Sequence, residues 1–323
     1  MNEVMSTTST LGPRERRDHL LARLGHRRME HRVLPGLYRL GQPDRSSPVL
    51  VSANYTLSFD ALRSSLRGID AYILVLDTKG VNVWCAAGKG TFGTDELVER
   101  IRSTSLESHV DHRRLILPQL GAPGVSAHEV KQRTGFSVEY GPVRAADLPD
   151  YLSSGATEEM RRVTFPLRDR AVLIPVELRN VAIEAVIAIV ALFILGGLVP
   201  ALIALMAVMA GAVLFPLLLP YLPTKDFTTK GMLLGIAASA PFAMYYLASE
   251  PGWTGLAYSA GTIMLMVSVV GFLALNFTGC TTYASRSGVR REIFRYVPAL
   301  VIMAVVGVSV LAIAIAIVAL GWF

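Results

Sequence analysis

Cysteine is scarce in this chain of 323 residues, which contains only Cys85 and Cys280. No Cys-X-X-Cys pair is present, so the sequence carries no motif for an iron–sulfur cluster or a structural zinc site. Two cysteines so far apart also do not suggest a disulfide framework. Any redox chemistry would therefore depend on a bound cofactor or on a separate electron donor.

The amino-terminal segment lacks the continuous apolar core of a secretory signal peptide, so we expect the first domain to stay in the cytoplasm. The segment is instead rich in arginine, with Arg14, Arg16, Arg17, Arg23, Arg27 and Arg28. The net charge of +6 could indicate nucleic-acid binding. Many of the cations, however, lie here and in loops beside apolar runs, where the positive-inside rule places them. We therefore expect no nucleic-acid partner.

Charge is nearly absent from five long apolar runs in the second half of the chain. The hydrophobic fraction of the whole sequence is 52% and its mean hydropathy is +0.45. Each run is close to the roughly 20 residues that a bilayer requires. The predicted spans are residues 181–198, 201–222, 232–248, 256–277 and 297–320. Glu184, near the start of the first span, is one of the few ionisable residues within them, which favours a docking or scaffold role over an ion pore.

The loops between these spans carry an uneven distribution of positive charge. Lys225 and Lys230 lie between the second and third spans, and several arginines between residues 286 and 295 precede the last. The turns at residues 197–200 and 249–252 carry no cation. The positive-inside rule then places the amino terminus inside and the carboxyl terminus outside.

The first half of the sequence alternates short apolar runs with amphipathic segments, as α/β domains do. We predict strands at residues 72–77, 115–117 and 137–140, in a mostly parallel sheet. Thr94 is expected to cap a helix whose inner stripe is Leu97, Val98 and Ile101. The loops after Asp77, Pro118 and Tyr140 would share one sheet edge, where ligands bind.

Three regions follow from these patterns. Residues 1–45 are expected to form a basic, partly disordered arm, and residues 46–175 a cytoplasmic α/β domain. Residues 176–323 are expected to form an all-α transmembrane domain of five helices.

The segment Asn82-Val83-Trp84-Cys85-Ala86-Ala87-Gly88-Lys89 is the most informative in the chain. Asn82 is a good helix N-cap, and Gly88 would end the helix after little more than one turn. Unpaired N–H groups and the helix dipole would favour the thiolate of Cys85, which is a good ligand for soft metals. A cysteine beside alanines is nevertheless most often a small buried apolar residue. Trp84 is equally typical of a residue that packs such a helix onto a sheet, so the segment alone leaves both interpretations open.

This segment, continuing as GTFGTDEL, resembles the signature of the mercury-methylating corrinoid proteins. Residues 54–60, 140–145 and 276–279 are similar as well, so the resemblance covers nearly the whole chain after the arm. That family is related to the large subunit of the corrinoid iron–sulfur protein of the acetyl-CoA pathway. Cys280 departs from the family pattern, which has a small polar residue at that position.

The resemblance implies a Rossmann-like domain that binds cobalamin or a related corrinoid. Cys85 would be the catalytic residue and the lower axial ligand of cobalt. The other residues of this helix would shape it against the macrocycle: Asn82, Val83, Trp84, Ala86, Ala87, Gly88 and Lys89. The geometry of the sheet edge adds further contact candidates: Gly121, Ala122, Pro123, Tyr140 and Gly141.

The resemblance also implies a reaction and its partners. A methyl group would pass from a methyltetrahydrofolate-type donor through cobalt to Hg(II), leaving as a carbanion equivalent. The cobalt must then be reduced, which implies a dicluster 4Fe-4S ferredoxin as electron donor. A methylated pterin or its methyltransferase would supply the methyl group, and the chain would lie in the inner membrane. Two alternatives are a methyl carrier for another acceptor and a non-catalytic corrinoid-binding membrane receptor.

Overall fold

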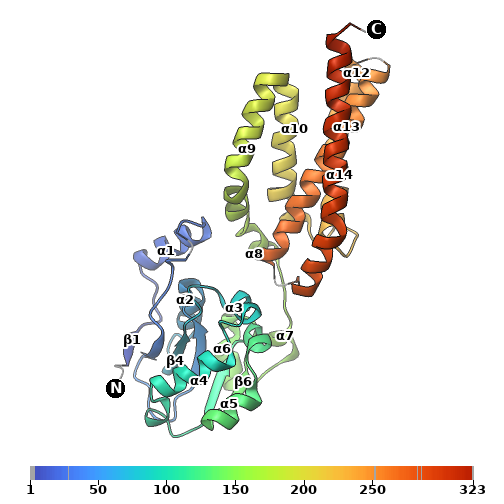
Figure 1. The fold of residues 1–323 in the computed structure, drawn as a ribbon. Coiled ribbons are helices and arrows are strands. Elements are labelled where there is room, and N and C mark those ends of the chain that lie inside the picture. Colours follow the sequence, from blue (N-terminus) through green and yellow to red (C-terminus); the bar gives the residue numbers. More distant parts are fainter. Residues whose placement is uncertain (1–3, 28, 251, 282, 285, 322–323) are drawn as a thin grey trace. The chain divides into compact units, whose positions relative to one another are not determined.

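The computed structural model describes residues 4–27, 29–250, 252–281, 283–284 and 286–321 (Figure 1). The chain divides into two compact units, with the boundary between Thr164 and Phe165. The sequence suggested a boundary ten or so residues later. The structure assigns that stretch to the second unit, where the guanidinium of Arg170 donates hydrogen bonds to the carbonyls of Pro216 and Leu217.

The first unit contains a six-stranded sheet in the order β1-β2-β4-β3-β5-β6. The strands are β1 (Met5–Thr7), β2 (Gly36–Leu40), β3 (Val49–Ala53), β4 (Ala71–Leu76), β5 (Arg114–Leu117) and β6 (Ser137–Tyr140). Strands β3, β4, β5 and β6 are mutually parallel, and β2 joins antiparallel to β4. The predicted mostly parallel sheet is therefore confirmed, and the loops after β4, β5 and β6 share one edge.

Helices cover both faces of this sheet (Figure 1). The helices of this unit are α1 (Pro13–Arg23), α2 (Thr56–Ser65), α3 (Val83–Lys89), α4 (Thr94–Ser103), α5 (Ala127–Thr134), α6 (Leu148–Ser154) and α7 (Glu158–Arg161), with 3-10 turns η1 (Leu106–Ser108), η2 (Gln119–Gly124) and η3 (Ala145–Asp147). Helices α3, α4 and α5 pack in one apolar cluster with Leu74 and Leu76 of β4. Helices α2 and α6 pack in the other, with Ile73 and Val75. Successive residues of β4 thus enter opposite clusters, as the pleat requires.

Two sequence-based expectations differ from the structure in this unit. The region expected as a partly disordered arm contains β1, α1 and β2, and β2 pairs with β4 along its whole length. Thr94 is the first residue of α4 rather than its cap, which is Gly93. The Thr94 hydroxyl instead accepts a hydrogen bond from the backbone N–H of Ser126 at 2.8 Å.

The second unit is helical. It contains α8 (Leu167–Ala171), α9 (Ile174–Gly196), α10 (Leu198–Met209), the π turn η4 (Ala210–Leu214), α11 (Phe215–Leu218), α12 (Phe227–Ser249), α13 (Trp253–Phe277), the 3-10 turn η5 (Thr278–Cys280) and α14 (Arg286–Ala319). Within the described residues, five helical stretches are long and apolar enough to cross a membrane. They are Leu167–Gly196, Leu198–Leu218, Phe227–Ser249, Trp253–Phe277 and Ser287–Ala319, and they confirm the prediction of five long apolar helices.

Small residues let these helices approach closely. A Cβ added at Gly231 of α12 would lie 2.4 Å from the Cβ of Ala274 in α13, and one at Gly235 would lie 2.8 Å from the Cα of Val267. The carboxylate of Glu292 accepts hydrogen bonds from the N–H groups of Phe227 and Thr228, at 3.2 and 2.9 Å. Glu292 therefore pairs with two N–H donors at the amino terminus of α12. These donors would raise the free energy of the fold if they lay unpaired in apolar surroundings.

Candidate functional site at the carboxyl edge of the sheet

The loop after β4 leads into α3, and Asn82 begins that helix as predicted. Its side-chain oxygen accepts a hydrogen bond from the backbone N–H of Cys85 at 2.9 Å. The N–H of Cys85 is thus engaged by the cap rather than left unpaired. Gly88 does not end the helix, contrary to the prediction. The helix runs to Lys89, and Gly90 provides the left-handed residue at its end, with φ +83°.

The inner face of α3 is formed by its alanines. Ala86 is fully buried and Ala87 is 5% exposed, and both belong to the core cluster of α4 and α5. Val83 packs against the same cluster. Cys85 and Trp84 are half-buried, whereas Gly88 and Lys89 are exposed. Cys85 is therefore not one of the fully buried small residues, and its side chain lies on the partly accessible side of the helix.

The turn η2 packs directly against α3. A Cβ added at Gly124 would lie 2.1 Å from the carbonyl oxygen of Phe92 and 2.9 Å from the Cα of Ala87. A Cβ at Gly121 would lie 2.6 Å from the ring of Phe92. The structure thus brings the predicted loop residues next to the predicted helix. Gly121 is buried, Ala122 is half-buried, and Pro123 is exposed at this edge.

Tyr140 and Gly141 stabilise the same edge from β6. The Tyr140 hydroxyl donates a hydrogen bond to the carbonyl of Val125 at 2.7 Å, directly after η2. Burial raises the pKa of this phenol, so it remains a donor at neutral pH. Gly141 is buried, and its N–H donates to the carbonyl of Leu117 at 2.8 Å. In this structure both residues hold the loop after β5 in place.

Asn54 is a residue of this site that the sequence analysis did not assign. It follows β3, is 1% exposed, and lies beside the loop that precedes α3. Its side-chain oxygen accepts from the N–H groups of Thr78 and Gly80, at 3.1 and 3.0 Å. Its amide group donates to the carboxylate of Asp77 at 3.1 Å. The Asp77 N–H in turn donates to Glu96 of α4 at 2.8 Å, so the loop is fixed from two elements.

Replacing Asn54 with alanine should loosen this loop and the start of α3. The buried N–H groups of Thr78 and Gly80 would lose their acceptor, at a cost of about 1–3 kcal/mol. Hydrogen exchange of residues 77–90 in the full-length protein should therefore become faster, while exchange in β5 changes little. Asn54→Asp keeps an acceptor but places a second carboxylate beside Asp77, so an intermediate effect is expected. Unchanged exchange in Asn54→Ala would mean that the loop holds its shape without this side chain.

Known proteins are similar to the part of the chain that contains this site. A family model described as the CO dehydrogenase/acetyl-CoA synthase delta subunit matches residues 26–152, which include α3 and the strands from β2 to β6. Residues 26–152 are homologous to this family. The similar curated proteins are gamma subunits of the acetyl-CoA decarbonylase/synthase complex, so the two comparisons point to subunits of related complexes.

Three of these relatives show how much of the chain is matched. The protein of Methanopyrus kandleri is 38% identical over 122 residues, which is 37% of this chain and 26% of that protein. Those of Methanothermobacter thermautotrophicus and Archaeoglobus fulgidus are 34% and 32% identical, over 39% and 37% of this chain and 28% and 26% of theirs. The chain thus spans about a quarter of the length of the curated relatives it matches.

Proposed function

We propose that this chain is a corrinoid-dependent methyltransferase that passes a methyl group from a methyltetrahydrofolate-type donor to Hg(II), giving methylmercury. The observation that carries the proposal is the position of Cys85. It is half-buried on a short helix at the carboxyl edge of a mostly parallel sheet, in a region homologous to subunits of acetyl-CoA complexes. Parallel α/β sheets bind their ligands at this edge.

The residues around Cys85 fit a flat macrocycle with a metal at its centre. A Cβ added at Gly88 would meet no atom within 4 Å, so the helix has open space beside its exposed glycine. The thiolate of Cys85 is a soft ligand of the kind that suits such a metal. Asn82, Trp84 and Lys89 would lie around the ring, and residues 121–123 would border it from η2.

A bound corrinoid supplies a cobalt centre that can accept and release a methyl group. Cys85 would hold the cobalt through its thiolate, which would donate electron density to the metal and favour departure of the methyl group toward a soft electrophile. Asn82 would hold the backbone of Cys85 through the 2.9 Å hydrogen bond. The buried Ala86 and Ala87 would keep α3 fixed on the core.

The full-length protein reconstituted with methylcobalamin should transfer one methyl group to Hg(II) and then stop. The chain has no Cys-X-X-Cys motif with which to hold an electron-transfer cluster, so further cycles require an external donor. Adding a reduced dicluster 4Fe-4S ferredoxin and a methyl donor should restore turnover. Methylmercury is measured over time with and without the ferredoxin.

Three other outcomes of this assay would contradict parts of the proposal. Transfer to a different acceptor but not to Hg(II) would indicate a methyl carrier for which mercury is incidental. Binding of corrinoid without transfer to any acceptor would indicate a membrane receptor. Repeated cycles without a reductant would contradict the need for the ferredoxin.

The orientation proposed for the membrane unit places its carboxyl terminus outside the inner membrane and the α/β unit in the cytoplasm. It rests on Lys225 and on the arginines of residues 286–295. Lys230, predicted in the same loop as Lys225, instead lies in the first turn of α12, where it donates to the carbonyl of Leu219 at 2.8 Å. A reporter fused to the carboxyl terminus should therefore be active only on the outer side. Activity on the cytoplasmic side would overturn the orientation.

A further inference from the structure

Helix α1 (Pro13–Arg23) has an unusual distribution of side chains between its two faces. Glu15, Asp18 and His19 are partly buried against the rest of the unit. Arg16, Leu20 and Arg23 are exposed on the opposite face. Leu20 is 58% exposed and Leu24, just after the helix, is 39% exposed. The surface of a soluble helix is normally polar, and its apolar stripe is normally buried. The outer face of α1 therefore requires an explanation other than packing within the chain.

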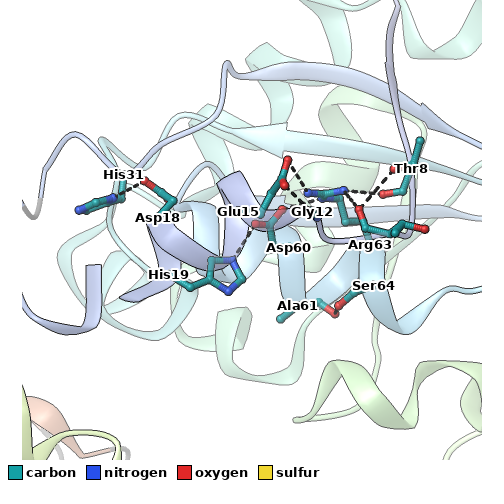
Figure 2. Close-up of polar contacts among 11 residues, drawn as sticks. Thr8, Gly12, Glu15, Asp18, His19, His31, Asp60, Ala61, Arg63 and Ser64 are labelled. Carbon is teal, nitrogen blue, oxygen red and sulfur yellow. Dashed lines mark hydrogen bonds and ion pairs between the residues drawn. The ribbon is translucent and has the colours of Figure 1, made fainter. Parts of the chain in front are cut away.

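Polar side-chain contacts fix the inner face of α1, as Figure 2 shows. His19 lies 2.7 Å from the buried carboxylate of Asp60. Glu15 lies 3.8 Å from Arg63, which also forms an ion pair with Asp60 at 2.6 Å. These contacts join α1 to α2 and determine which face of α1 remains outside.

A second histidine–carboxylate pair holds the same face. His31 is 6% exposed, and its ring nitrogens lie 2.7 Å from the Asp18 carboxylate and 2.6 Å from the carbonyl of His26. Both partners are acceptors, so a protonated ring can donate to both of them at once. Burial lowers the pKa of His31, but the hydrogen bonds to His26 and Asp18 outweigh it and raise the pKa. Asp18 is thereby kept away from the outer face.

The outer face is consequently both basic and apolar. Arg16 precedes Leu20 by four residues and Leu24 follows it by four, so the three lie along one side of the helix. Arg17 and Arg23, three residues to either side of Leu20, border the same stripe and are exposed. Within the part of the chain that the structure describes, Arg16, Arg17 and Arg23 form no ion pair.

We propose that this outer face of α1, defined by Arg16, Arg17, Leu20, Arg23 and Leu24, docks on a bilayer surface rich in anionic phospholipid. Helices that lie in the membrane interface combine leucines with arginines in this way: the apolar side chains enter the headgroup region and the cations pair with phosphates. The same chain contains five helices that could cross a membrane, so a bilayer surface is always near. An acidic protein would also attract the arginines but gives no reason for the leucines between them. The proposal is independent of the methyl-transfer function.

Hydrogen exchange of the full-length protein in lipid nanodiscs tests this docking. The discs contain either phosphatidylcholine alone or phosphatidylcholine mixed with phosphatidylglycerol. Residues 13–24 should exchange more slowly in the anionic discs than in the neutral ones, and added salt should reduce the difference. Residues 56–65 of α2 should exchange equally in both and report that the unit is folded.

Variants separate the outer face from general charge. In Arg16→Glu/Arg23→Glu and in Leu20→Ser/Leu24→Ser, the slowing of exchange caused by phosphatidylglycerol should be lost, with α2 unchanged. The matched control is Arg67→Glu/Lys131→Glu, which changes the net charge by the same amount at two exposed positions, one just after α2 and one in α5. In this control, phosphatidylglycerol should still slow the exchange of residues 13–24. Equal exchange of residues 13–24 in both kinds of disc would overturn the proposal. So would protection that appears only when an acidic protein such as a ferredoxin is added, which would identify a protein partner instead.

Discussion

Cys85→Ala should abolish mercury methylation while leaving the fold intact. Alanine has the highest helix propensity, and the backbone N–H of residue 85, which alanine keeps, can still donate its hydrogen bond to the side-chain oxygen of Asn82. Loss of a residue that only hydrogen-bonds to a metal ligand typically lowers metal affinity or activity by about 10–100-fold. Loss of the ligand itself should therefore lower the rate of methylation by at least about 100-fold. The rate of methylmercury formation and the absorption spectrum of the cobalamin-loaded protein measure the two consequences. The spectrum should lose the feature of a cobalt–thiolate bond, even where corrinoid still binds.

Cys280→Ala is the matched control, because it removes the second thiol of the chain. Cys280 is the last residue of η5 in the helical unit, whereas Cys85 belongs to the α/β unit. The control should methylate mercury like the parent and keep the spectrum. If both single variants are as active as the parent, the thiolate mechanism is wrong. If only Cys280→Ala is inactive, the reaction or the entry of mercury depends on the helical unit.

The fold was predictable where local pattern alone determines an element. The run from Tyr72 to Leu76, at the start of the strand predicted over residues 72–77, is continuous and apolar. A strand buried on both faces requires that pattern, and β4 confirms it over Ala71–Leu76. Leu97, Val98 and Ile101 repeat at helical spacing and form the buried stripe of α4. The five long apolar helices were predictable for the same reason, since their length and apolarity can be read from the sequence.

Elements whose order depends on distant residues were not predictable. The arm is short of apolar residues, but α1 is held through His19 and Asp60, which lie 41 residues apart in sequence. Asn54 belongs to residues 54–60, which carry part of the family resemblance. The hydrogen bonds that it accepts from Thr78 and Gly80 nevertheless exist only because β3 and β4 are neighbours in the sheet. Thr94 shows the limit of capping rules, because its hydroxyl accepts a hydrogen bond from the backbone N–H of Ser126 instead of capping its own helix.

The candidate site was predictable in part. Asn82 caps α3 as expected, because capping is a local interaction. The end of the helix was misplaced because two glycines lie near it, and only the backbone distinguishes the helical Gly88 from the left-handed Gly90. The contact of η2 with α3 followed correctly from the shared sheet edge. The corrinoid-binding roles of Cys85 and its neighbours stay predictions.

Gly124→Ala should have a larger effect on the unliganded protein than any other single change at this edge. The added Cβ would lie 2.1 Å from the carbonyl oxygen of Phe92 and 2.9 Å from the Cα of Ala87. Both are backbone atoms, so neither can rotate away, and η2 and α3 must separate. Overpacking of this kind costs about 1–3 kcal/mol or more. Hydrogen exchange of residues 83–103 should accelerate before any corrinoid is added, and corrinoid affinity should fall with it.

Gly88→Ala is the complementary change, on the exposed side of the same helix. No atom lies within 4 Å of the added Cβ, and alanine in a helix is favoured over glycine by about 1 kcal/mol. Exchange of α3 in the unliganded protein should therefore slow slightly. If a macrocycle lies against this face, the methyl group should nevertheless weaken corrinoid binding. A Gly88→Ala protein that is more stable and binds cobalamin as tightly as the parent would show that the corrinoid does not lie over Gly88. Because Gly124→Ala acts on the core and Gly88→Ala on the open face, the pair distinguishes a damaged helix from a blocked binding surface.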